Sequence, residues 1–142
     1  MKKSTRNIHY LVVHCSATPE GREHTAKDID LWHRQRGFEG IGYNYIVRLD
    51  GTVEEGRDVN KIPAHVEGHN KDSIGICYIG GIDKNTLQPK DTRTPAQKEA
   101  LKKLLTELKA LYPEAEILGH RDFPGVAKAC PCFDAKKEYK NI

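Results

Sequence analysis

The sequence predicts one α/β domain that spans residues 1–142. Three observations lead to this prediction. Segments typical of strands and of helices alternate along the chain, which is the pattern of α/β folds. A length of 142 residues suits one domain with a core of its own. No internal repeat, low-complexity tract or linker divides the chain.

The first third of the chain predicts a buried strand followed by a helix. Residues 8–15 (IHYLVVHC) are apolar and rich in β-branched side chains, as expected of a buried strand. Residues 25–37 predict a helix in which Thr25 is the N-cap and Gly37 ends the last turn. The apolar face of this helix carries Ile29, Trp32 and His33.

Residues 42–57 predict a β-hairpin. Alternating large side chains predict one shared face, formed by Tyr43, Tyr45, Val47 and Leu49. The pair Asp50-Gly51 predicts a two-residue turn between the two strands, because this pair readily adopts the required left-handed backbone.

The second half of the chain predicts two more strands around a long helix. Residues 72–81 form a buried strand that ends in glycines, and residues 116–119 form a short strand that delivers His120 into a loop. The helix begins at Thr94, with Pro95 in its first position and Gln97 completing a capping box. One apolar stripe at helical spacing consists of Leu101, Leu104, Leu105, Leu108 and Leu111.

The composition excludes several classes of protein. The net charge is +3 and is spread along the chain without a Lys/Arg run, so no nucleic-acid partner is expected. The longest apolar stretches, 10–13 and 76–79, fall far short of the roughly 20 residues of a membrane span, so no membrane insertion is expected. The basic start of the chain lacks the apolar core of an export signal. Four cysteines are too few for a disulfide scaffold, which favours thiol or metal chemistry.

Two of the seven histidines, His14 and His120, stand where predicted apolar strands end. Ligands of open α/β sheets bind beyond strand ends, and Cys130 or Cys132 could join the two imidazoles from the following loop. Two imidazoles and one thiolate suit zinc, and three protein ligands leave the open position of a catalytic site. A structural site using both cysteines is a weaker alternative, because it would need a tight turn where Pro131 restricts Cys130 to extended conformations. A Cys130–Cys132 disulfide is weaker still, because it would close a very small, strained ring.

For several other candidate residues a structural role is the better interpretation. His33 is expected to pack in the core beside Trp32. We expect surface or core positions for His9, His24 and His69. We expect Cys15 and Cys77 to be small apolar residues of the core.

Several motifs in the same order resemble one family. They are VHCSAT (13–18), WHRQRGF (32–38), GYNYIV (42–47), DGTVEEGRD (50–58), HNKDSIGICYIGGID (69–83), TPAQ (94–97) and KACPCFD (128–134). The chain from His14 to Asp134 is similar to the zinc-dependent N-acetylmuramoyl-L-alanine amidases of the phage T7 lysozyme type. These share their fold with the peptidoglycan recognition proteins.

The resemblance implies a central mixed β-sheet flanked by helices, and a set of functional residues. His14, His120 and Cys130 correspond to the ligands of one Zn²⁺ per chain. Tyr43 and Lys128 correspond to catalytic residues, and His65 to a histidine that lines the substrate groove. Two features depart from the family pattern: Cys132 occupies a position that is usually a small residue, and FPGV (123–126) lengthens the loop before Lys128.

The implied activity is hydrolysis of the lactyl amide bond between N-acetylmuramic acid and L-alanine by a zinc-activated water, with Lys128 stabilising the oxyanion and Tyr43 assisting proton transfer. The implied partners are peptidoglycan and muropeptides, and the protein is expected to act as a monomer. Without an export signal, we expect synthesis in the cytoplasm and release to the cell wall, as for a phage or prophage lysin. A housekeeping recycling amidase is the alternative.

Two other functions fit parts of the sequence. The first is a non-catalytic peptidoglycan-binding module of the same fold. Such relatives lack the cysteine ligand, which Cys130 supplies here. The second is a cysteine hydrolase in which Cys130 or Cys132 is the nucleophile and His120 the base. The two alternatives differ from the amidase in their sensitivity to chelators and to thiol alkylation.

Overall fold

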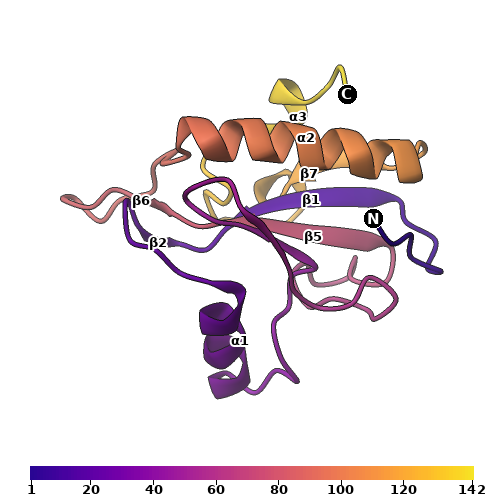
Figure 1. The fold of residues 1–142 in the computed structure, drawn as a ribbon, viewed down its shortest axis with the longest axis horizontal. Coiled ribbons are helices and arrows are strands. Elements are labelled where there is room, and N and C mark those ends of the chain that lie inside the picture. The colour runs from indigo at the N-terminus through magenta and orange to yellow at the C-terminus, as the bar shows by residue number, and fades with distance from the viewer.

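A five-stranded mixed sheet forms the centre of the computed structural model, which describes residues 1–142 (Figure 1). Its strands are β1 (Tyr10–Cys15), β3 (Tyr45–Val47), β4 (Val53–Glu55), β5 (Ser73–Tyr78) and β7 (Glu116–Gly119), in the order β4-β3-β5-β1-β7. Only β4 is antiparallel to its neighbour, and all other pairings are parallel. The predicted α/β fold with a mixed sheet is therefore confirmed.

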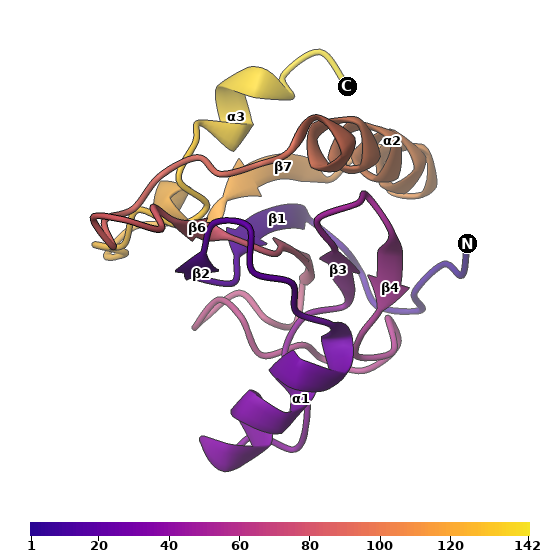
Figure 2. The ribbon, with the colours of Figure 1, turned by 60° about the vertical axis from the view of Figure 1, so that its left-hand side comes forward.

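Helices lie on both sides of this sheet. Figures 1 and 2 show α2 (Pro95–Leu111) across one face and α1 (Ala26–Gln35) on the opposite side, with α3 (Ala135–Glu138) next to α2. A small parallel pair, β2 (Thr18–Pro19) and β6 (Gly81–Ile82), extends beyond the ends of β1 and β5. None of the helices combines the length and apolar character that a membrane span requires.

Both long helices begin with a capping box. The Thr94 hydroxyl accepts a hydrogen bond from the Gln97 amide, and the Gln97 side chain accepts one from the Thr94 amide, as predicted. Gln97 is fully buried, and its side-chain amide also donates to the Val47 and Ile79 carbonyls. One residue therefore caps α2 and fixes this end of the helix to the sheet.

The two faces of the sheet are chemically different. Because side chains alternate along a strand, Leu11, Val13 and Cys15 of β1 join the main apolar core under α2. Val12 and His14 point to the other face. On β5 the residues on this second face are Ser73, Gly75 and Cys77, whereas Ile74, Ile76 and Tyr78 pack in the core. The second face therefore carries most of the polar groups of the two central strands.

The structure corrects two details of the predicted hairpin. Tyr45 and Val47 pack in the core under α2, whereas Tyr43 and Leu49 pack in a separate cluster around Ile29. The strand β3 contains only three residues, so the alternation does not extend to Tyr43 or Leu49. The predicted two-residue turn is wrong as well. Residues 48–52 connect the strands, and the Arg48 amide donates to the Thr52 carbonyl.

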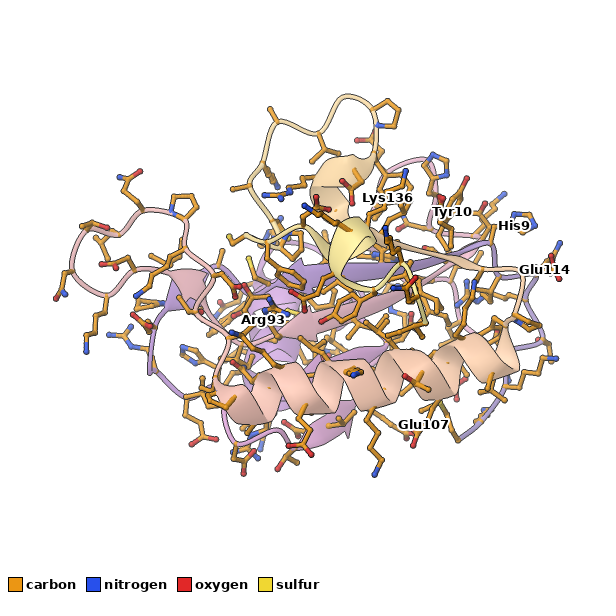
Figure 3. The ribbon with its side chains drawn as sticks, turned by 90° about the horizontal axis from the view of Figure 1, so that it is seen from above. His9, Tyr10, Arg93, Glu107, Glu114 and Lys136 are labelled. Carbon is orange, nitrogen blue, oxygen red and sulfur yellow. The ribbon has the colours of Figure 1, made fainter.

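A buried arginine ties α3 to the start of α2. The Arg93 guanidinium bonds Asp91 and Glu138, and it lies over the Phe133 ring at 3.4 Å from the centroid. Figure 3 looks onto the α2 face, with Arg93 near the first turn of α2 and Lys136 marking α3. This connection fixes the segment that follows Cys130 against the body of the protein.

The stripe of leucines on α2 should account for much of the stability. Leu105 is fully buried, whereas Leu31 on α1 is 54% exposed. We expect Leu105→Ala to lower the free energy of unfolding by about 2–5 kcal/mol, because it leaves a cavity in the main core. The matched control Leu31→Ala should change it by less than about 0.5 kcal/mol. Urea unfolding followed by circular dichroism measures both, and equal losses would contradict this description of the core.

Candidate metal centre

Two histidines from distant parts of the chain lie side by side at the ends of β1 and β7. The strands are parallel neighbours whose last pair is Val13 opposite Gly119, so the next residues, His14 and His120, lie side by side directly after it. Their ring centroids are 4.6 Å apart. His14 is buried and His120 half-buried at the first residue of the short helix η1 (His120–Asp122).

Cys130 approaches these histidines from a loop that is fixed by hydrogen bonds. The Cys130 carbonyl accepts from the Arg121 amide, and the Pro131 carbonyl accepts from the Tyr78 hydroxyl at 2.6 Å. The Cys130 Sγ lies 3.8 Å from His14 Nδ1 and accepts a hydrogen bond from the Cys15 amide. One donor atom each from His14, His120 and Cys130 lie within 4.8 Å of one another.

Cys132 lies outside this cluster. Its Sγ is 3.9 Å from Cys15 Sγ and 3.4 Å from the Gly81 carbonyl oxygen. Burial raises the pKa of the Cys132 thiol to about 12, so it is protonated near neutral pH. All four cysteines are free thiols. The structure therefore contains neither a Cys130–Cys132 disulfide nor a site that uses both of these sulfurs.

The His14, His120 and Cys130 cluster is part of the lining of a cavity of about 850 Å³. Tyr43, His65 and Lys128 line the same cavity. Its walls come from the end of α1 and the loop after it, from residues 64–67, 69 and 70, and from residues 123–128. The loop lengthened by FPGV thus forms part of one wall. A space of this volume can admit an extended polar ligand next to the cluster.

Several residues that line the cavity were not predicted from the sequence. Arg36 and Asn70 line the cavity, and His69, which was expected to be structural, lies in its wall with its ring 4.9 Å from that of Phe123. His33 is buried as predicted, and its Nδ1 accepts from the Gly42 amide, yet it too reaches the cavity. Nothing in the sequence marked these residues, which lie at the C-terminal end of α1 or in the loop before β5.

Tyr43 lies directly beside the cluster. Its ring centroid is 5.0 Å from that of His14, and the hydrogen bond between the preceding residue, Gly42, and His33 holds the backbone there. A Cβ at Gly42 would lie 2.2 Å from the Ala64 carbonyl oxygen, so only glycine fits at this position. Burial raises the pKa of the Tyr43 phenol well above its usual value, so it stays protonated and can donate a hydrogen bond.

Lys128 supplies positive charge at the exposed rim. Burial lowers the pKa values of His14 and His120, and the Lys128 ammonium group lowers both of them further. Both imidazoles are consequently neutral near pH 7, which is the form that binds metal ions. The ammonium group itself is solvent-accessible and free to approach a ligand in the cavity.

His65 contacts the cluster as well as the cavity. Its Nδ1 is 2.7 Å from His14 Nε2, and its Nε2 is 2.8 Å from the Ser73 hydroxyl oxygen. Burial, together with the nearby His120, lowers the pKa of His65 to about 3, so its ring is neutral. The resemblance implied only a place in the groove, and nothing in the sequence indicated these two contacts.

The three donor atoms of the cluster fit a zinc ion. Tetrahedral ligands at zinc–ligand distances of 2.0–2.3 Å lie about 3.5 Å apart, close to the separation of His14 Nδ1 and Cys130 Sγ. Imidazole nitrogen and thiolate sulfur are both preferred zinc ligands. The donor set therefore fits such an ion.

Comparisons with known proteins give a consistent result. The family model described as N-acetylmuramoyl-L-alanine amidase matches residues 4–133. The endolysin of Escherichia phage T7 is 38% identical over 135 residues, which cover 95% of this chain and 87% of that protein.

Two solved structures have similar folds. The endolysin and N-acetylmuramoyl-L-alanine amidase LysCS from Clostridium intestinale superposes with a TM-score of 0.78 and 29% identity, covering 99% of this chain and 86% of that one. A Drosophila PGRP-LB mutant in complex with tracheal cytotoxin gives a TM-score of 0.75 and 26% identity, covering 99% and 84%.

Proposed function

The chain belongs to the N-acetylmuramoyl-L-alanine amidase family, and on this premise we propose that His14, His120 and Cys130 bind one catalytic zinc ion. As a member of the family it is a hydrolase that cleaves the amide bond between N-acetylmuramic acid and L-alanine in peptidoglycan. The observation that carries the zinc proposal is the convergence of three donor atoms in the wall of the cavity.

Each of the three ligand residues has a defined task in this proposal. His14 and His120 offer neutral imidazole nitrogens, and Cys130 offers a sulfur that the hydrogen bond from the Cys15 amide holds beside them. When zinc is bound in such a site, it supplies Lewis-acid polarisation of the scissile carbonyl and activation of water.

Lys128 is proposed to stabilise negative charge on the substrate. As water adds to the scissile carbonyl carbon, charge develops on the carbonyl oxygen. A thiolate ligand lowers the net charge of a divalent site from +2 to +1. A second cation nearby then contributes more to stabilising the negative charge on the carbonyl oxygen. Lys128 extends from the loop that also carries Cys130 and is free to reach that oxygen.

Tyr43 is proposed to orient the attacking water. Its phenol is protonated because of burial and lies beside His14, so it can donate a hydrogen bond or hold a proton in transit to the leaving amine. The close contact of Gly42 with the Ala64 carbonyl and its hydrogen bond to His33 fix the backbone before Tyr43, so the phenol is held in one place beside His14.

The setting of the reaction is part of the proposal. We propose that residues 1–142 act as one catalytic domain and as a monomer. The cavity opens directly to solvent and so can receive a glycan strand or a released muropeptide. Synthesis in the cytoplasm and release to the cell wall would match a phage or prophage lysin, consistent with the endolysin among its relatives.

Mass spectrometry of digested muropeptides tests this function. The protein should release stem peptides with a free L-alanine amino group, EDTA should abolish the release, and added Zn²⁺ should restore it. Zinc binding without release of peptides would favour a non-catalytic binding module. Activity that survives EDTA but is lost on thiol alkylation would favour a cysteine hydrolase.

A pair of cysteine substitutions tests the ligand assignment. We expect Cys130→Ala to lose bound zinc and activity, because one of three ligands is removed. Cys132→Ser should keep both, because Cys132 contacts Cys15 and Gly81 and no ligand atom. Zinc content by atomic absorption and muropeptide release measure the two properties. Equal losses in both variants would refute the assignment of Cys130 as the sole sulfur ligand.

The role of Lys128 has its own prediction. Lys128→Ala should lower kcat by about 10²–10³, as expected when a group that stabilises an oxyanion is removed. The zinc content should stay unchanged, since Lys128 is no ligand. Lys136→Ala is the matched control, because Lys136 is exposed on α3 and lies outside the cavity. A loss of kcat below threefold in Lys128→Ala would show that its charge is dispensable.

A further inference from the structure

A row of hydrogen bonds runs from the metal cluster into the sheet. His14 presents Nδ1 to the cluster, at 3.8 Å from Cys130 Sγ, and Nε2 to His65. His65 in turn contacts the Ser73 hydroxyl through its Nε2. Ser73 is fully buried at the start of β5, so the row ends inside the protein and not at the solvent.

The chemistry of a ligating imidazole sets the direction of these hydrogen bonds. A neutral imidazole that binds a metal through Nδ1 carries its proton on Nε2. His14 Nε2 then donates to His65 Nδ1, and this leaves the proton of His65 on Nε2, where it can donate to Ser73. Every ring nitrogen in the row has one compatible partner.

The His65 ring is itself held from two sides. The Asn70 side-chain oxygen accepts hydrogen bonds from the His65 and Val66 amides, which fixes the backbone. The ring lies against Gly75 of β5, where a Cβ would come within 2.9 Å of His65 Cγ. The missing side chain at Gly75 therefore makes room for the ring next to Ser73.

We propose that His65 is a positioning residue that orients His14 for metal binding, with Ser73 fixing the ring of His65 in turn. This inference rests on the proposed zinc site and deepens it. Partners of this kind hold a ligating histidine in one orientation and one tautomer, and their loss weakens metal binding about 10- to 100-fold. Both nitrogens of His65 are engaged by protein atoms, so neither is free to bind a substrate in the cavity.

Three variants and a control separate positioning from substrate contact. His65→Leu removes both hydrogen bonds at similar volume. His65→Asn keeps an oxygen acceptor at the place of Nδ1, and Ser73→Ala removes only the outer partner. His69→Leu is the control, because His69 lines the same cavity but has no contact with the three ligands. Circular dichroism confirms that each variant is folded.

The readouts are zinc affinity, by competition with a chromophoric chelator, and the absorption spectrum of the Co²⁺-substituted protein. We expect His65→Leu to weaken zinc binding about 10- to 100-fold and to alter the cobalt spectrum. His65→Asn should recover most of the affinity, and Ser73→Ala should lose about 10-fold, the low end of that range. His69→Leu should bind zinc as the unsubstituted protein does. If His65→Leu does not fold, the zinc affinities of His65→Asn and Ser73→Ala test the inference.

Three results would overturn the inference. In the first, the His65 variants keep full zinc affinity and raise only the KM for muropeptide, which would make His65 a substrate contact. In the second, His65→Asn loses as much affinity as His65→Leu, so the acceptor is irrelevant. In the third, the unsubstituted protein binds no zinc. If the protein binds zinc but does not cleave muropeptide, the proposed amidase function is refuted. The zinc affinities of the variants relative to the unsubstituted protein then still test the role of His65.

Discussion

The parallel pairing of β1 with β7 is the constraint on which the site depends. The pairing places Val13 opposite Gly119, and it brings together two histidines that are more than a hundred positions apart in the sequence. Neither strand can shift by one residue without moving its apolar side chains out of the core. The same register that buries Leu11 and Ile117 under α2 therefore aligns His14 with His120. The two histidines therefore come together only in the folded domain.

The division of the sheet into two faces explains why a cluster of imidazoles can be buried at all. The face under α2 holds the main core and with it most of the hydrophobic stabilisation. The opposite face can then tolerate polar groups, provided that each has a partner. His14 bonds His65, His65 bonds Ser73, and Asn44 exchanges hydrogen bonds with the backbone of Gly75. Burial also keeps the histidines neutral, as metal binding requires.

The fold was largely predictable because its signals are local. The Thr25 N-cap, the Thr94 capping box, the leucine stripe of α2 and the apolar strands each lie within one stretch of sequence, and the structure contains all of them. The hairpin turn was not predictable, because tertiary packing of Leu49 against the α1 cluster competes with the Asp50-Gly51 signal. The placement of His14 and His120 at strand ends was visible in the sequence. The partner of His14 was not, because it depends on a side-chain contact between residues 51 positions apart.

The two neighbouring cysteines show how backbone geometry determines which sulfur faces the histidines. The Arg121 amide holds the Cys130 carbonyl, and the Tyr78 hydroxyl holds the Pro131 carbonyl, so the loop cannot rotate to exchange the two sulfurs. Gly119 allows this close approach, since a Cβ there would lie 2.7 Å from Pro131. Cys132 has a backbone φ of 71°, and its sulfur points towards Cys15 and Gly81. The sulfur that faces the histidines is therefore the one that accepts the Cys15 amide hydrogen bond, while burial raises the pKa of the Cys132 thiol and keeps it protonated.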